Sequence, residues 1–254
     1  FVVVLIAVAT VGLFAAGGHF GANWLIRAQQ ERAVDGLLNL VNRRTESSLN
    51  FATAALDQLE ARDLGNCDAT TMQAVRFRVY QLGTIKDIRL TSRNGAVRCS
   101  ALPETLEFDR AWPSRDEMVP FHDGKHLIFR VDQYNQSSIG LMRDLDAEYS
   151  IVAVLPLPTT ALDVLPEELQ RNANVIVRIA GQQPLASLYP IDSLGSIAAF
   201  ESFTLTSDNF PVLAEIRIDA RTLAYWLGEI YWPLLSLVTA LGLAIALLLM
   251  RLLL

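Results

Sequence analysis

The stretch that decides the fold reads CDATTM (residues 67–72) and, after a helical segment, IKDIRLTSRNGAVRCSA (residues 85–101). It holds the only two cysteines among 254 residues, Cys67 and Cys99. Such a pair is most simply interpreted as a disulfide, and closing a loop of about 33 residues would stabilise the fold by roughly 3–4 kcal/mol. The spacing alone leaves open whether the two sulfurs meet, because a bridge requires Cα atoms closer than about 7 Å.

The second half of this stretch has the pattern of a β-hairpin. Apolar and polar residues alternate over residues 85–92, an Asn-Gly pair follows at 94–95, and a second strand returns over 96–101. Asn-Gly between two such runs is the strongest short-range hairpin signal. Capping residues also predict a helix over Thr71–Leu82. Cys67 precedes this helix and follows the long helical pattern of residues 24–62, so a bridge to Cys99 would fasten the end of that long helix to a sheet.

The surrounding region predicts an α+β domain. Residues Trp24–Arg62 repeat apolar side chains at the three-and-four spacing of an amphipathic helix, which either packs on its own domain or forms a dimer seam. Short helices are predicted at Thr159–Leu165 and Pro166–Arg171. Further strands are predicted at Glu117–Phe121, Lys125–Val131, Tyr149–Leu155, Val175–Ala180, Phe200–Thr206 and Val212–Ile218. Hairpin-connected strands behind one long helix predict a domain built on an antiparallel sheet.

Both ends of the chain are apolar. Neither Phe1–Ile26 nor Ile230–Met250 contains an Asp, Glu, Lys or Arg, and about 20 apolar residues cross a membrane as a helix. We therefore expect transmembrane helices at 1–23 and 230–254, with one domain at 24–229 between them. A cleaved signal peptide is the alternative for the first run. Because the chain starts with Phe and stops within a run of leucines, we expect it to be a piece of a longer protein that lacks its start and whatever follows the second span.

The location of the domain follows from the two spans and the cysteines. Two spans place both ends of the chain on one side of the membrane, and Arg251 after the second span favours the cytoplasm for those ends. The cysteine pair favours an oxidising space for the domain, such as the periplasm. The net charge of −6 argues against nucleic-acid binding.

No catalytic or metal site is evident in the residue pattern. His122 and His126 flank an Asp-Gly turn signal, so we expect surface histidines beside a hairpin. There is no glycine-rich phosphate loop. Glu167 and Glu168 follow Pro166 and fit the charged first turn of a helix.

One group of charges could line a small-ligand pocket. Asp144 and Asp146 lie near Arg130 and Arg143 in the sequence, and solvated surface charge is the alternative interpretation. The residues alone do not identify a ligand.

The cysteine stretch and its flanking spans together resemble a known family. Cys67 before a helix, a strand of the Ile-Lys-Asp-Ile type, an Asn-Gly turn and Cys99 followed by Ser100 are similar to the CSS-motif sensor domain of bacterial EAL-type cyclic-di-GMP phosphodiesterases. The family's Cys-Ser-Ser reads Cys99-Ser100-Ala101 here. The resemblance implies a multi-pass inner-membrane protein with residues 24–229 in the periplasm. It further implies that Cys67 and Cys99 form a redox pair controlling the phosphodiesterase, with Ser100 as a motif neighbour.

The same resemblance places the chemistry outside this segment. The catalytic carboxylates and their divalent metal (Mg or Mn) would lie in the downstream EAL domain, so we expect no catalytic, cofactor or metal residue here. The implied partners are membrane lipid, a periplasmic thiol oxidase and reductase system, and a second copy in a homodimer. Two alternatives stay open. One is a two-span small-ligand sensor with a purely structural disulfide, and the other is a non-signalling membrane scaffold.

Overall fold

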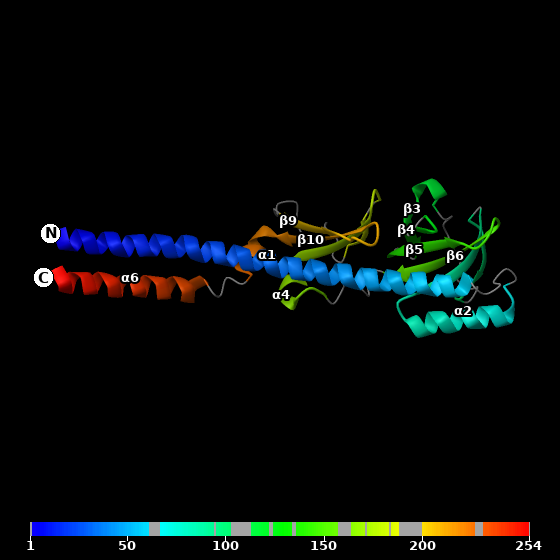
Figure 1. Cartoon of the computed structure of the whole chain (residues 1–254), viewed down its shortest axis with the longest axis horizontal. Coiled ribbons are helices and arrows are strands. Elements are labelled where there is room, and N and C mark those ends of the chain that lie inside the picture. Colours follow the sequence, from blue (N-terminus) through cyan, green and yellow to red (C-terminus); the bar gives the residue numbers. More distant parts are fainter. Residues whose placement is uncertain are drawn as a thin grey trace. The chain divides into compact units, whose positions relative to one another are not determined.

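The computed structural model describes residues 2–60, 67–93, 95–102, 113–121, 124–133, 136–156, 164–170, 172–182, 184–187, 200–226 and 231–253. These residues form two compact units. The first comprises Phe1–Gly36 and Ile218–Leu254, and the second comprises Leu37–Arg217. The long helix α1 (Val2–Glu60) begins in the first unit and ends in the second (Figure 1).

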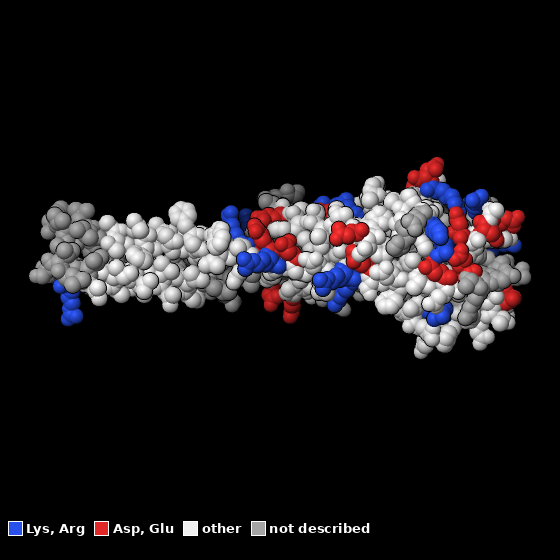
Figure 2. All heavy atoms as spheres, in the orientation of Figure 1, with Lys and Arg blue, Asp and Glu red and all other residues white. Residues whose placement is uncertain are grey.

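The first unit pairs the beginning of α1 with α6 (Tyr231–Leu253). Within the described residues, Tyr231–Leu248 of α6 is the one helical stretch found long and apolar enough to cross a membrane. The other predicted span, at residues 1–23, is not shown and stays a prediction. Figure 2 shows this apolar part of the molecule almost free of charged side chains, whereas the part with the sheets carries both signs.

Close packing joins α1 and α6 within this unit. A Cβ atom added to Gly242 would lie 2.6 Å from Phe14 Cβ, and one added to Gly18 would lie 2.8 Å from Val238 Cγ1. Glycine therefore lets the two helices approach closely at both points. The Tyr231 hydroxyl is also hydrogen-bonded to Nδ1 of His19 at 2.5 Å.

The short helix α5 (Ala220–Tyr225) belongs to the same unit. Asp219 caps its start by accepting a hydrogen bond from the Thr222 amide at 3.1 Å. The buried Gln30 amide of α1 donates to the carbonyls of Leu223 and Trp226 at 2.5 and 2.7 Å. These bonds satisfy carbonyl groups that the end of a helix leaves without an internal partner.

In the second unit α1 buries one side, as its sequence period predicts. The buried apolar residues are Leu38, Val41, Leu49, Ala52, Ala55, Leu56 and Leu59. The polar segment between the two halves of this stripe is also partly buried. Its buried Thr45 has a hydrogen-bond partner there, because the hydroxyl donates to the Val41 carbonyl at 2.9 Å. The amphipathic helix predicted at Trp24–Arg62 is thus confirmed through Glu60.

The first sheet has the strand order β2-β1-β6-β5-β4-β3, and every neighbouring pair is antiparallel. Its strands are β1 (Asp87–Ser92), β2 (Val97–Ser100), β3 (Val119–Phe121), β4 (His126–Gln133), β5 (Gln136–Asp144) and β6 (Tyr149–Pro156). Helix α2 (Ala69–Leu82) precedes β1, and a 3-10 turn, η1 (Arg115–Glu117), precedes β3. The predicted hairpin is confirmed as β1 and β2, with Leu90 opposite Cys99.

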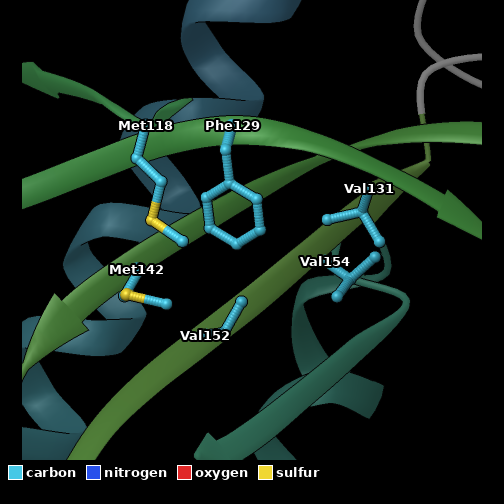
Figure 3. Packing of buried hydrophobic residues seen from close by; sticks show 6 residues of the cluster. All are labelled: Met118, Phe129, Val131, Met142, Val152 and Val154. Carbon is cyan, nitrogen blue, oxygen red and sulfur yellow. The ribbon is translucent and has the colours of Figure 1, made fainter. Parts of the chain in front are cut away.

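The two faces of this sheet differ, because side chains alternate along each strand. On one face, Ile88, Leu90 and Ile151 line a small recess together with residues of α2. On the other face, a buried cluster consists of Met118, Phe129, Val131, Met142, Val152 and Val154 (Figure 3). The Phe129 ring lies against Gly140, where an added Cβ would be only 2.6 Å from it.

A second sheet corrects the expectation of a single one. Its strands are β7 (Ala173–Ile179), β8 (Pro184–Ser187), β9 (Phe200–Thr206) and β10 (Val212–Asp219), in the order β8-β7-β10-β9, and α4 (Glu167–Gln170) precedes it. Strands β5 and β8 were not predicted. Strand β5 opens with polar residues and β8 with proline, so neither shows a typical strand pattern. Most of the helix predicted at Thr159–Leu165 lies outside the described residues.

Candidate functional site

Cys67 and Cys99 form a disulfide, with their Cα atoms 6.1 Å apart. Cys67 directly precedes the capping residue of α2, where the Asp68 side chain accepts a hydrogen bond from the Thr71 amide at 2.6 Å. The backbone of Cys67 has a positive φ of 48°, which is uncommon for a residue with a side chain. Cys99 lies on the edge strand β2. The bridge therefore fastens the start of α2 to one edge of the first sheet.

The surroundings of the bridge are apolar and only partly closed. Cys99 borders a recess of about 10 Å³ whose other walls come from α2, β1 and β6. Both cysteines are half-buried. A disulfide in this position is held by packing on one side, and neither of its cysteines is fully buried.

Ser100 follows Cys99 on β2 and points to the opposite face of that strand, where it contacts a buried ion pair. Ser100 lies opposite Arg89 in the β1–β2 register, and its hydroxyl is 2.9 and 2.8 Å from the two carboxylate oxygens of Asp87. Arg89 donates from Nε to Asp87 Oδ2 at 2.5 Å. Asp87 is 0% exposed and Arg89 is 3% exposed. The residue that follows Cys99 therefore touches a charge that is fully removed from water.

Three further bonds hold the end of β2. The Leu102 amide donates to Asp87 Oδ1 at 3.3 Å, and the Ala101 amide donates to the Ile88 carbonyl at 2.9 Å. Arg76 of α2 donates from Nε to the Ala101 carbonyl at 3.1 Å. The short segment after Cys99 thus contacts both α2 and the buried carboxylate.

A second charged group joins α1 to the sheet. Arg143 of β5 forms ion pairs with Asp57 and Glu60 near the end of α1. His126 of β4 lies 3.0 Å from Asp57 Oδ1 and is 4% exposed. The expectation of a surface histidine at 126 is therefore wrong, because the carboxylate of α1 gives this ring a polar partner inside the fold. His122 lies outside the described residues.

The charges considered for a ligand pocket have separate partners. Asp144 pairs with Arg115 of η1, and the hydrogen bond from that guanidinium, helped by one from Ser150, lowers the pKa of Asp144 although burial opposes it. Arg130 pairs with Asp132. Asp146 accepts hydrogen bonds from two backbone amides in a turn, both at 2.7 Å. Because Arg143 forms its ion pairs with α1, these charged side chains do not converge on one ligand site.

Sequence reasoning located Cys67, Cys99 and Ser100 but missed the buried pair beside them. The signal was an acid and an arginine two positions apart in the Ile-Lys-Asp-Ile-Arg-Leu run, which places both on one face of a strand. In the part of the chain that the structure describes, no three His, Cys, Asp or Glu side chains are arranged to hold a metal ion. The candidate functional site is thus the disulfide with the Ser100 network.

Comparisons with known proteins agree with this architecture. One similar solved structure is the sensor domain of the V. cholerae histidine kinase DctB, with 8% identity, a TM-score of 0.55, and coverage of 76% of this chain and 98% of that one. Another is the extracellular domain of rpHK1S-Z16, described as a histidine kinase, with 10% identity, a TM-score of 0.54, and coverage of 78% and 97%. At such identities the likeness concerns the fold alone.

The sequence comparison is more specific. No curated protein matches the sequence. The family model of the CSS motif domain associated with EAL matches residues 30–227, which is more than half of the chain and includes both cysteines. The chain therefore belongs to the family of CSS-motif domains.

Proposed function

We propose that this chain is the membrane-anchored sensor segment of an EAL-type cyclic-di-GMP phosphodiesterase, and that the redox state of Cys67 and Cys99 regulates the enzyme. The observation that carries the proposal is the bridge between these two residues inside a domain whose family is associated with EAL. The bridge is half-buried at a sheet edge, where a partner's thiol or disulfide can reach it.

The proposed topology places residues 1–23 and 230–254 in the bacterial inner membrane and residues 24–229 in the periplasm. The apolar helix α6 supports the second span, and the charge-free run before Arg27 supports the first. A disulfide is favoured in an oxidising compartment, which supports the periplasm for the domain.

The proposed switch is a thiol–disulfide exchange with periplasmic partners. The two cysteine thiols lose two electrons and two protons through a mixed disulfide, and the disulfide of the thiol oxidase takes them up to become a dithiol. A dithiol reductase reverses the reaction. Opening the bridge releases α2 from β2, so the covalent change occurs at the junction between the helices and the first sheet.

The proposed output lies beyond residue 254. There an EAL domain would hydrolyse cyclic-di-GMP with its own carboxylates and a divalent metal ion, Mg or Mn. We place no catalytic residue in the present segment. We further propose a homodimer, because the long helix α1 offers a continuous seam through which two copies could pass a change toward the membrane.

The experiment that tests this proposal is thiol trapping in intact cells. Cells with and without their periplasmic thiol oxidase are quenched with acid, and the protein is labelled with a maleimide mass tag before and after reduction. We expect Cys67 and Cys99 to be blocked in the first strain and free in the second. Free labelling in both strains would exclude a redox switch.

Phosphodiesterase activity then tests the link to the output. Cys67→Ala and Cys99→Ala should change cyclic-di-GMP hydrolysis by the full-length protein to the same extent. Ser92→Ala removes a hydroxyl from the same hairpin without touching the bridge, and it should leave activity unchanged. If the cysteine variants match the wild type, the bridge is structural, and the domain is then better explained as a small-ligand sensor.

A further inference from the structure

Strand β2 is weakly held apart from its bridge. It has four residues, lies at the edge of the sheet and, among the strands that the structure describes, pairs only with β1. None of its four residues is fully buried, and its register with β1 is interrupted between Leu90 and Thr91. Short edge strands of this kind open at low free-energy cost. If β2 is to stay in place when the disulfide is reduced, another contact has to hold it.

Ser100 provides such a contact. Its hydroxyl can donate to either carboxylate oxygen of Asp87, since Ser100 Oγ lies 2.9 Å from Oδ1 and 2.8 Å from Oδ2. Hydrogen bonds to a carboxylate are roughly twice as strong as those between neutral groups, and the effect of charge is larger away from water. Because Asp87 is fully buried, losing this donor would leave a desolvated carboxylate with one fewer partner.

The geometry points to a role for the motif serine: we infer that Ser100 keeps β2 docked over the Asp87–Arg89 pair when the bridge is open, and so keeps Cys99 positioned to re-form it. This inference deepens the redox regulation proposed above and rests on it. Ser100 is a positioning residue, since it acts on Cys99 through the backbone of β2. Docking of β2 raises the effective concentration of one thiol near the other.

The consequence is a shift in the thiol–disulfide equilibrium. In a dithiothreitol redox buffer, the two protein thiols give two electrons and two protons to oxidised dithiothreitol, which yields the Cys67–Cys99 bridge and reduced dithiothreitol. If β2 leaves the sheet in the reduced state, forming the bridge must first restore it. The equilibrium constant for oxidation is then multiplied by the fraction of reduced molecules in which β2 stays docked, so a smaller docked fraction gives a smaller constant.

The test measures this constant on the full-length protein in detergent. For Ser100→Ala we expect a roughly tenfold lower constant, which is a reduction potential about 30 mV less negative. Ser100→Thr keeps the hydroxyl and should restore the wild-type value. Ser92→Ala is the matched control, because its hydroxyl donates at 3.1 Å to the Ala96 carbonyl in the same hairpin and does not reach Asp87. A wild-type constant for Ser100→Ala would overturn the inference.

This readout separates positioning from a general loss of stability. A destabilisation shared by the oxidised and reduced proteins cancels in the constant and leaves it unchanged. It also separates this inference from the proposed function. If Ser100→Ala leaves the constant unchanged while the trapped bridge still depends on the oxidase, only the role of the serine fails.

Hydrogen exchange on the wild type and on Ser100→Ala gives a second test. The amides of Ala101 and Leu102 donate to the Ile88 carbonyl and to Asp87, so both report docking of β2. We expect them to stay protected after reduction of the wild type and to lose protection after reduction of Ser100→Ala. Full exchange at both amides in the reduced wild type would also overturn the inference.

Discussion

The two sheets differ in how far the arginine partners of a buried acidic side chain are exposed to solvent. Each has an acid and an arginine two positions apart on one strand, Asp87 and Arg89 on β1 and Glu215 and Arg217 on β10. In the first sheet the side chains of both partners are almost fully buried, at 0% and 4% exposure. In the second, Glu215 is 7% exposed, but Arg217 and its other partner Arg178 are 32% and 30% exposed.

This difference shows what each sheet depends on. The arginines of Glu215 reach solvent, so that carboxylate is satisfied by side chains that remain partly hydrated. The Asp87–Arg89 pair is contacted by Ser100 and Leu102, which follow the bridged Cys99. The state of one covalent bond therefore bears on a buried charge in the first sheet. The second sheet contains no cysteine.

The largest expected effect comes from removing the buried carboxylate of the first sheet. Asp87→Asn takes a counter-charge away from a buried guanidinium, and breaking a buried ion pair in this way costs about 3–5 kcal/mol. Thermal unfolding of the detergent-solubilised protein should show a correspondingly large decrease in Tm. A decrease no larger than that of Glu215→Gln would contradict the contrast between the two sheets.

A double variant sharpens this first prediction. Replacing both Asp87 and Arg89 by apolar residues, as Leu and Met, removes the charges together and should restore most of the lost stability. The same variant leaves Ser100 without its acceptor. It should therefore show the lower thiol–disulfide constant expected of Ser100→Ala even though its Tm is close to that of the wild type.

The next effect comes from removing the bridge. Cys67→Ala combined with Cys99→Ala should lower the free energy of unfolding by about 3–4 kcal/mol, because the unfolded chain loses a closed loop of about 33 residues. Hydrogen exchange should place the local loss of protection at α2 and β2 and leave β7 and β10 protected. An equal loss in both sheets would mean that the bridge stabilises the domain as a whole.

The features that the sequence predicted correctly are local ones. The hairpin around Asn94-Gly95 and the helix before it are encoded within a few residues, and the apolar stripe of α1 repeats at helical spacing. The cysteine pair could be recognised because no other cysteine competes for it. Ser100 was found through its place in the motif.

The features that were missed depend on distant partners. Strand β1 pairs with β6, whose residues lie far along the chain, and burial of Asp87 depends on that neighbour and on the return of β2. His126 becomes a buried residue only through Asp57 of α1. No local pattern contains these pairings, which is why the burial of Asp87 was not predicted and His126 was expected at the surface.

A smaller effect is expected in the second sheet. Glu215→Gln should lower the free energy of unfolding by about 1–2 kcal/mol, because the amide keeps one acceptor and both arginines can turn toward water. Burial acts to raise the pKa of Glu215, but the hydrogen bonds and positive charges of Arg217 and Arg178 together lower it. Urea unfolding at pH 7 measures the change. A loss equal to that of Asp87→Asn would show that partial exposure of the arginines does not matter.

The smallest effect concerns acid sensitivity at the first sheet. The hydrogen bond from Arg115 lowers the pKa of Asp144 below its ordinary value of about 3.9, so its ion pair stabilises the fold above that pH and is lost as the pH falls through the lowered pKa. Arg115→Gln should raise that pKa and thereby reduce the decrease in Tm between pH 5 and pH 3. Arg93→Gln, which removes only a weaker charge effect on Asp144, should change the decrease less. Glu215 keeps its own arginines in both variants, so its contribution is the same in both. Equal curves for the two variants would mean that the Arg115 pair contributes nothing to the acid sensitivity.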